Sequence, residues 1–178
     1  TARYTAFITG RTHTEDPRPI PLDIKKQVDR LLADGKITME VKSDQCWNGI
    51  TPVNTKAPIL SDVRVRQALN LAVDRTAHIQ NLWDGQGTPM MVFPADSLWG
   101  RPLSEMLKAP GYRQPKDQDI AQAKKLLAEA GYPNGLEITM LGIFDTQMQQ
   151  GEAFAADFAK IGVRVKLIQR DQAAAFDA

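Results

Sequence analysis

The sequence predicts an α/β domain in which helices flank a mixed β-sheet. Two observations support this fold class: apolar residues recur at helical spacing in several stretches, and short runs rich in β-branched residues lie between them. Helices that alternate with short strands pack on the faces of a common sheet. Because 178 residues suffice for one hydrophobic core, we expect a single lobe over residues 1–178.

The first third of the chain is predicted to hold two helices and two strands. Apolar residues spaced i, i+3 and i+4 predict helices at 1–10 and 22–34. Between them, three prolines within residues 14–21 exclude a regular element. Alternation with period two predicts a strand at 37–41, and a second strand is expected at 46–53.

Residues 61–75 form the most informative stretch. Ser61 or Asp62 can cap a helix, because a short side-chain oxygen accepts from amide groups that lack a partner in the first turn. On a helical wheel, five residues then share one apolar face that should pack on the core. They are Val65, Ala68, Leu69, Leu71 and Ala72.

Two polar residues in this stretch have further predicted roles. Arg64 lies beside Leu71 at the edge of the apolar face, so its guanidinium must reach water, a carboxylate or a carbonyl. Asp74 is expected to cap a second helix over 75–84. Glycines at 85 and 87 should end that helix.

The remaining chain is predicted to alternate helices and strands after one irregular segment. Residues 86–116 are rich in glycine, proline and methionine and show no period. A helix is expected at 117–130 and a strand at 136–141. A helix near 146–161 and a strand at 163–168 follow.

The composition favours an ordinary globular protein and gives little support to several functional classes. Hydrophobic residues make up 43% and charged residues 24%. The net charge of +1 gives no reason to expect a nucleic acid or an anionic membrane as partner. The apolar stretches all fall short of the ~20 residues that a membrane-spanning helix needs.

The usual signatures of catalytic and metal sites are missing from the sequence. The lone Cys46 cannot form an internal disulfide, so cysteine usage does not indicate the compartment. His13 and His78 are too far apart for zinc-ligand spacing, and His78 is expected at the surface or the core edge. A Gly-x-Ser-x-Gly elbow is lacking as well. We therefore expect no metal, no cofactor and no enzyme activity.

Several motifs together resemble one family. Residues 61–75 resemble the signature helix of the family 5 extracellular solute-binding proteins, the peptide-, nickel- and oligosaccharide-capturing receptors of ABC importers. Residues 53–58 resemble that family's strand ending in Asn, followed by a Pro-containing turn. Residues 120–132 are similar to its second signature helix, and residues 6–10 to its Ala-Phe-x-x-Gly helix end. The resemblance covers nearly the whole chain.

This resemblance implies a fold and a function. The expected fold is one lobe of a type II periplasmic-binding-protein-like (Venus-flytrap) protein, and the chain is expected to be a fragment covering most of the second, C-terminal lobe. The implied function is capture of a peptide or related small solute for an ABC permease in the membrane. The protein would be a monomer in the periplasm, either free or lipid-anchored at the cell surface.

The resemblance leaves two questions open. The solute is not specified, because the family includes nickel-, glutathione- and sugar-binding members. The same lobe also occurs as the solute-sensing domain of transcriptional regulators, which is the alternative function.

Four aromatic and amide residues are the candidates for ligand contact. Trp47 and Asn48 lie in a predicted strand, and Phe93 and Trp99 lie in the irregular segment. A cleft for a peptide or a sugar needs apolar contact area and a few orienting hydrogen bonds. The alternative for both tryptophans is packing within the core or against loops. Because one lobe leaves the cleft open on one side, the isolated chain is expected to bind solute weakly or not at all.

Overall fold

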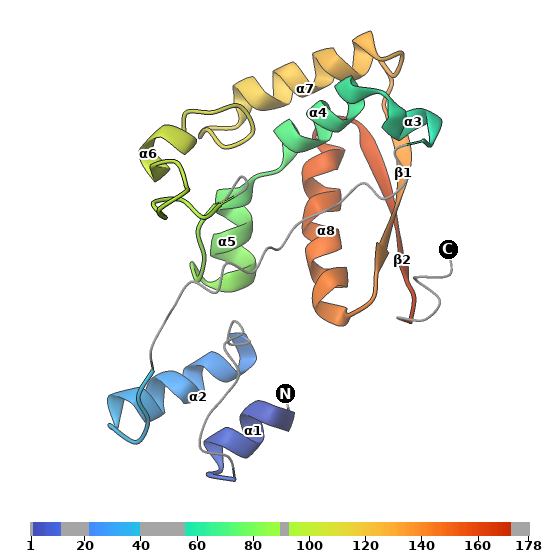
Figure 1. The fold of residues 1–178 in the computed structure, drawn as a ribbon. Coiled ribbons are helices and arrows are strands. Elements are labelled where there is room, and N and C mark those ends of the chain that lie inside the picture. The colour runs from blue at the N-terminus through green and yellow to red at the C-terminus, as the bar shows by residue number, and fades with distance from the viewer. Residues whose placement is uncertain (1, 12–21, 40–55, 90–92, 172–178) are drawn as a thin grey trace. The chain divides into compact units, whose positions relative to one another are not determined.

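The computed structural model describes residues 2–11, 22–39, 56–89 and 93–171 (Figure 1). The chain divides into two compact units. Unit 1 comprises Thr1–Asn48 and Ile79–Thr88, and unit 2 comprises Gly49–His78 and Pro89–Ala178. The single lobe over residues 1–178 stays a prediction.

Unit 1 is built on two helices, α1 (Ala2–Ile8) and α2 (Leu22–Ala33), which confirms both predicted helices. Ile24 and Val28 of α2 are buried. Side chains from α1, from the end of α2 and from the segment after it pack against this pair; they are Ile8, Leu32 and Ile37.

The predicted strand at 37–41 is wrong in its described part, because residues 37–39 form no strand. Ile37 instead packs against the buried side chains of α2, while Met39 is exposed. The alternation of apolar and polar residues therefore reflects a single side chain packed on a helix rather than a strand in a ladder. The predicted proline-rich loop at 14–21 and the predicted strand at 46–53 lie outside the described residues.

In unit 2, the informative stretch folds as predicted. It forms α3 (Pro58–Ser61) and α4 (Val63–Ala72). The next helix, α5 (Arg75–Trp83), begins in unit 2, and its residues from Ile79 onward belong to unit 1. Asp62 caps α4 by accepting from the Arg64 amide at 2.8 Å. Four residues of the predicted apolar face are buried and Leu69 packs against them; the buried four are Val65, Ala68, Leu71 and Ala72.

Arg64 has both a carboxylate and a carbonyl partner, as predicted from its place at the edge of the apolar face. Its guanidinium lies 2.6 Å from the Asp62 carboxylate and also donates to the carbonyl of Glu129, the last residue of α7, at 2.6 Å. Hydrogen bonds from Arg64 lower the pKa of the Asp62 carboxyl. Arg66 is half-buried and donates to the Leu60 carbonyl at 2.6 Å. These contacts tie α4 to its two neighbouring helices.

The second half of unit 2 alternates helices and strands in the predicted order. After the short α6 (Leu103–Met106) come α7 (Asp117–Glu129), β1 (Leu136–Gly142), α8 (Asp145–Ala159) and β2 (Val163–Gln169). β1 and β2 pair in parallel, and α8 packs on both strands (Figure 1). The segment β1–α8–β2 is therefore a βαβ unit.

The residues just before the two strands approach each other closely. The register starts at Leu136 opposite Val163. One residue earlier, a Cβ atom on Gly135 would lie 1.9 Å from the carbonyl oxygen of Gly162. Only glycine fits at position 135, where φ is +85°.

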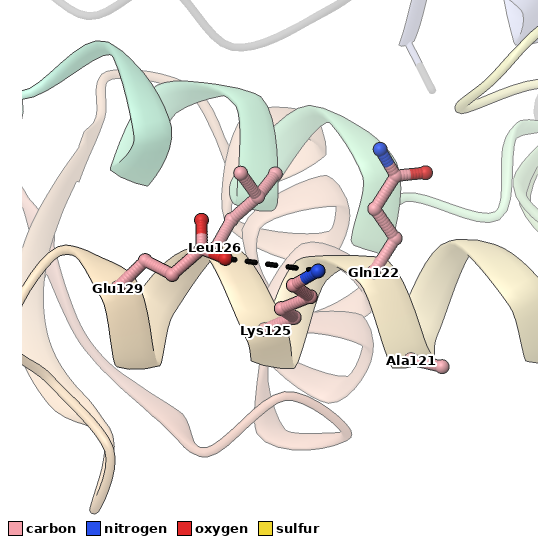
Figure 2. A pocket seen from close by; sticks show the side chains of 5 residues that line it. All are labelled: Ala121, Gln122, Lys125, Leu126 and Glu129. Carbon is pink, nitrogen blue, oxygen red and sulfur yellow. Dashed lines mark ion pairs between the residues drawn. The ribbon is translucent and has the colours of Figure 1, made fainter.

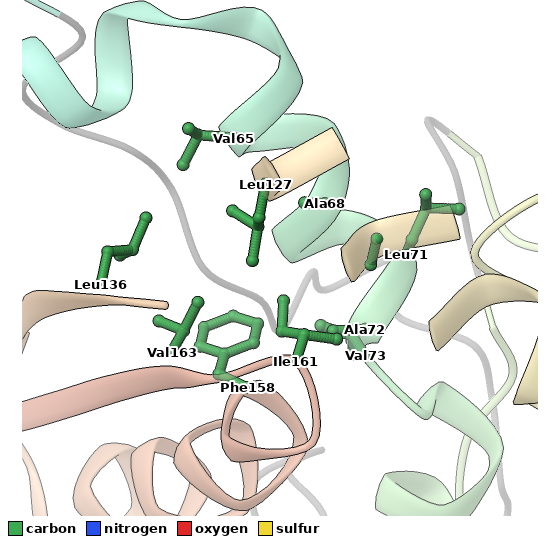
Figure 3. Close-up of a cluster of buried hydrophobic side chains, with 11 residues drawn as sticks. Val65, Ala68, Leu71, Ala72, Val73, Leu127, Leu136, Phe158, Ile161 and Val163 are labelled. Atoms are coloured by element: carbon green, nitrogen blue, oxygen red, sulfur yellow. The ribbon is translucent and has the colours of Figure 1, made fainter. Parts of the chain in front are cut away.

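The core of unit 2 lies where α4, α7 and α8 meet the amino ends of β1 and β2 (Figure 3). Its buried side chains are Val65, Ala68, Leu71, Ala72, Val73, Ala123, Leu127, Leu136, Phe158, Ile161 and Val163. Leu136 and Val163 are the first residues of the two strands. The apolar packing therefore holds the strands at their beginnings and leaves their carboxyl ends toward the surface.

The described end of the irregular segment is fastened to α7 by a buried carboxylate. Asp119 is fully buried and accepts from the Gly111 amide at 2.9 Å, from Lys116 Nζ at 2.8 Å and from Arg113. Burial would raise the pKa of Asp119, but the hydrogen bonds from Lys116 and Arg113 outweigh it and lower the pKa. On the other side, Arg75 donates to the Gly111 carbonyl at 2.7 Å.

A second buried carboxylate, Asp157 of α8, fixes that helix to the junction between α4 and α5. It accepts from the Asp74 amide at 2.8 Å, from His78 Nε2 at 2.9 Å and from Lys160 Nζ at 2.8 Å. His78 is nearly buried and meets the ring of Phe154 edge-on, which confirms its predicted place at the core edge. Asp74 also caps α5, since its carboxylate accepts from the Ala77 amide at 3.0 Å.

The three donors govern the titration of Asp157. Burial would raise its pKa, but hydrogen bonds from His78, Lys160 and the Asp74 amide lower it from 3.8 to about 2. A carboxyl whose pKa is lower in the folded than in the unfolded chain stabilises the fold above its unfolded pKa. That stabilisation is lost as the pH falls toward the folded pKa.

Truncation of a core leucine should destabilise unit 2 strongly. Leu127 is 1% exposed, and Leu127→Ala is expected to lower the free energy of unfolding by about 2–5 kcal/mol through lost burial and the cavity left behind. Leu98, which is 88% exposed, provides the matched control: Leu98→Ala should change it by less than about 0.5 kcal/mol. Denaturant titration of both variants measures the difference, and equal effects would contradict the core described above.

Replacement of Asp157 should change how stability depends on pH. Asp157→Asn removes a charged acceptor and is expected to lower the free energy of unfolding at pH 7 by about 1.5–3 kcal/mol. Between about pH 4 and pH 2 the wild type should lose this advantage, because its own carboxyl then becomes protonated. Unfolding curves at several pH values should therefore converge toward low pH. A constant difference would contradict the lowered pKa of Asp157.

Candidate functional site

The candidate site lies at the carboxyl ends of the two parallel strands. β1 ends at Gly142 and β2 at Gln169, and these two residues are paired, so both ends meet at one edge of the sheet. In open α/β sheets, ligands bind in the crevice outside the carboxyl ends of the strands. α8 begins at this edge. We define the strand-end site as residues 142–147 and 169–171.

The turn from β1 into α8 is held by a side chain of the helix. Oε1 of Gln147, in the first turn of α8, accepts from the backbone amides of Ile143 at 2.7 Å and Phe144 at 3.3 Å. In return, the Gln147 amide donates to the Phe144 carbonyl at 2.9 Å. The side chain of the third helical residue thus accepts from the N-cap amide, as in one half of a capping box, while phenylalanine has no side-chain oxygen for the other half. It fixes the backbone that carries the Phe144 side chain.

Two further hydrogen bonds tie the end of β2 to the same turn. Gln169 Nε2 donates to Asp145 Oδ1 at 2.9 Å, and the Arg170 amide donates to the Gly142 carbonyl at 3.0 Å. The carboxyl ends of both strands and the amino end of α8 thus form one connected structure.

The sheet face opposite α8 becomes apolar toward the strand-end site. Successive residue pairs along this face are Glu137–Arg164, Thr139–Lys166 and Leu141–Ile168. The first pair is an exposed ion pair with its closest charged atoms 3.9 Å apart, whereas Leu141 in the last pair is 45% exposed. Phe144 follows and is 56% exposed. The site therefore offers apolar contact area beside the hydrogen-bonded turn.

Two shallow hollows of unit 2 lie elsewhere. One is lined by Ala121, Gln122, Lys125, Leu126 and Glu129 on α7 (Figure 2). It has an exposed ion pair, Lys125–Glu129, at 3.8 Å, and such a pair contributes little to binding. The other is lined by Glu137, Ala155, Ala159, Val163, Arg164, Val165 and Lys166. Both are open surface depressions without the convergent polar groups that mark a ligand site.

Two of the four sequence-predicted contact residues are described, and both are exposed. Phe93 is 45% and Trp99 75% exposed, and the neighbouring Leu98 is 88% exposed. The exposure of Trp99 disagrees with the alternative that this residue packs in the core. Trp47 and Asn48 lie outside the described residues.

The loop that carries Trp99 has an ordered backbone. The Leu103 amide donates to Asp96 Oδ1 at 3.0 Å, and Asp96 has a left-handed backbone with φ of +60°. A Cβ atom on Gly100 would lie 1.9 Å from the carbonyl oxygen of Pro94, so the loop closes too tightly for any other residue there. These constraints hold Trp99 in solvent on a fixed backbone.

Trp99 makes none of the hydrogen bonds that form the strand-end site. The helix that follows its loop, α6, lies on the other side of α8 from β1 and β2 (Figure 1). Sequence reasoning missed Phe144 and Gln147. The signal was present, because a predicted strand, helix and strand in succession imply a parallel pair whose carboxyl end falls near residue 142.

Neither a metal-ligand cluster nor a membrane-spanning helix occurs in the part of the chain that the structure describes. Within it, His, Cys, Asp and Glu side chains form no group of three or more that could hold a metal ion. Among the same residues, the helices are all too short or too polar to cross a membrane.

The family model for bacterial extracellular solute-binding proteins, family 5 Middle, matches residues 1–178. The chain belongs to this family. Heme-binding protein A of Haemophilus influenzae is 35% identical over 117 residues, which are 62% of this chain and 20% of that protein. The dipeptide-binding protein of Escherichia coli is 30% identical over 158 residues, which are 85% of this chain and 27% of that protein.

A solved structure of the family confirms the fold class. The ABC transporter-associated periplasmic binding protein DppA from Helicobacter pylori, in complex with the peptide STSA, superposes with a TM-score of 0.53 at 26% identity. The match covers 68% of this chain and 22% of that chain. The predicted α/β fold, a lobe of the periplasmic-binding-protein type, is thereby confirmed. As with the two relatives above, the chain spans only about a quarter of a family member's length.

Proposed function

We propose that this chain is part of the solute-binding component of an ABC importer. The whole protein would capture a peptide or a related small solute in the periplasm and deliver it to a membrane permease. Family membership supports this proposal, as do two relatives named for binding heme and dipeptides and a similar structure that contains a peptide. We further propose that the protein acts as a monomer, either free or lipid-anchored, and performs no covalent chemistry.

The observation that carries this proposal is the strand-end site. An exposed aromatic ring, an exposed leucine and a turn fixed by hydrogen bonds meet where a parallel sheet usually binds its ligand. Apolar area with a few fixed polar groups suits a peptide, which has apolar side chains on a hydrogen-bonding backbone. A second lobe closing over this edge would exclude water from the bound solute.

The four residues expected from the sequence remain proposed contacts. Phe93 and Trp99 have exposed rings that a solute or the second lobe can cover. Trp47 and Asn48 are proposed on the sequence pattern alone.

The proposal is tested with the whole protein that contains this chain. Isothermal titration calorimetry should show saturable binding of at least one of three probes: the dipeptide Ala-Phe, the tripeptide Ala-Phe-Ala, or glutathione. Binding should have a negative heat-capacity change, because apolar surface is buried. If none of the probes binds at millimolar concentration, the proposed peptide-like solute class is wrong.

Phe144→Ala should weaken solute binding with little effect on stability. Loss of an exposed ring that becomes covered on binding is expected to raise Kd about tenfold, equivalent to about 1.4 kcal/mol. Because Phe144 is 56% exposed, the free energy of unfolding should change by less than about 0.5 kcal/mol. Calorimetry and denaturant titration measure the two quantities, and an unchanged Kd would remove Phe144 from the site.

Trp99→Ala tests the second proposed contact separately. If the indole meets the solute, Kd should rise about tenfold while the fold stays intact, since the ring is 75% exposed. Binding of the solute should also shift the fluorescence of the wild type, and this part of the shift should be absent in the variant. Leu98→Ala is the control for a change in the same loop. An effect of Leu98→Ala equal to that of Trp99→Ala would point to loop disturbance instead.

A further inference from the structure

We propose that Gln147 is the positioning residue that pre-forms the strand-end site before solute arrives. Gln147 belongs to the first turn of α8, and its contacts described above are all with the turn that leaves β1. The inference rests on the proposed function, because it assigns a role within the same site.

The geometry gives Gln147 control over the backbone around Phe144. One amide oxygen accepts from two consecutive amides, those of Ile143 and Phe144. Phe144 has an extended backbone, with φ of −108° and ψ of 154°, and immediately precedes the helix. Without this acceptor the two amides would have to turn to water, and the turn would sample other conformations.

The two other hydrogen bonds near the turn do not replace those of Gln147. The hydrogen bond from Gln169 to Asp145 joins β2 to the first residue of α8, and the bond from Arg170 to Gly142 joins the two strand ends. The first of these bonds involves Asp145, just after residues 143–144, and the second involves Gly142, just before them. In the described part of the chain, the amides of residues 143 and 144 therefore have Gln147 Oε1 as their acceptor.

Pre-forming the turn matters because ordering a loop on binding weakens affinity. Loss of a helix-capping interaction typically amounts to about 0.5–2 kcal/mol. If that energy must be supplied when solute binds, Kd rises about two- to thirtyfold. The distant core does not depend on this turn, so global unfolding should be less sensitive.

The chemistry of Gln147 allows a control that separates positioning from direct contact. Its Nε2 donor has no hydrogen-bond partner among the described residues. A glutamate at position 147 keeps the acceptor and lacks this donor, and glutamate is a favoured capping-box residue at this place in a helix. A positioning role therefore predicts that Gln147→Glu restores function, whereas direct donation to the solute predicts that it does not.

The experiment compares the wild type, Gln147→Ala and Gln147→Glu in the whole protein that contains this chain. Hydrogen exchange of the Ile143 and Phe144 amides is measured without solute, and Kd for Ala-Phe-Ala is measured by calorimetry. We expect faster exchange and a Kd two- to thirtyfold higher for Gln147→Ala, with both values near wild type for Gln147→Glu.

The outcomes separate the inference from the proposed function. Equal exchange in the wild type and Gln147→Ala overturns the positioning role, whether or not any solute binds. Faster exchange with unchanged Kd also overturns it, as does weak binding by Gln147→Glu when its exchange is normal. If the wild type binds no probe, the proposed peptide-like solute class fails, and the exchange data still decide whether Gln147 holds the turn.

Discussion

The buried carboxylate of Asp157 is the interaction on which the arrangement of unit 2 depends. It lies on α8 and binds the backbone amide of Asp74 at the junction of α4 and α5, together with His78 and Lys160. A buried charge is tolerated only when several donors compensate for its lost hydration, and here three do so. Because α8 also connects β1 to β2, this contact helps to place the helix whose first turn shapes the strand-end site.

Core packing and the proposed ligand contact are separated along the strands. The core encloses the amino ends of β1 and β2, where Gly135 and Gly162 permit a close approach. The carboxyl ends remain accessible and carry an apolar pair followed by Phe144. This separation lets the site vary without disturbing the core, which is consistent with a family whose named relatives bind solutes as different as dipeptides and heme.

The sequence was most reliable where local physics dominates. Helix caps at Asp62 and Asp74 follow from short-range hydrogen bonding, and both were predicted correctly. Arg64 was predicted to need a carboxylate or a carbonyl and found both. The predicted strand at 37–41 was wrong in its described part, because alternation also arises when a segment outside any strand packs one side chain, Ile37, against a helix.

The sequence by itself determined the family, the order of the elements in unit 2 and the apolar faces that form the core, because these depend on residue spacing along one chain. Only the tertiary structure placed Gln169 against Asp145 and the carbonyl of Glu129 against Arg64. It also placed α6, which follows the loop of Trp99, on the other side of α8 from the two strands (Figure 1). Such contacts join residues far apart in sequence, and their distances are set by how helices and strands pack rather than by any local pattern.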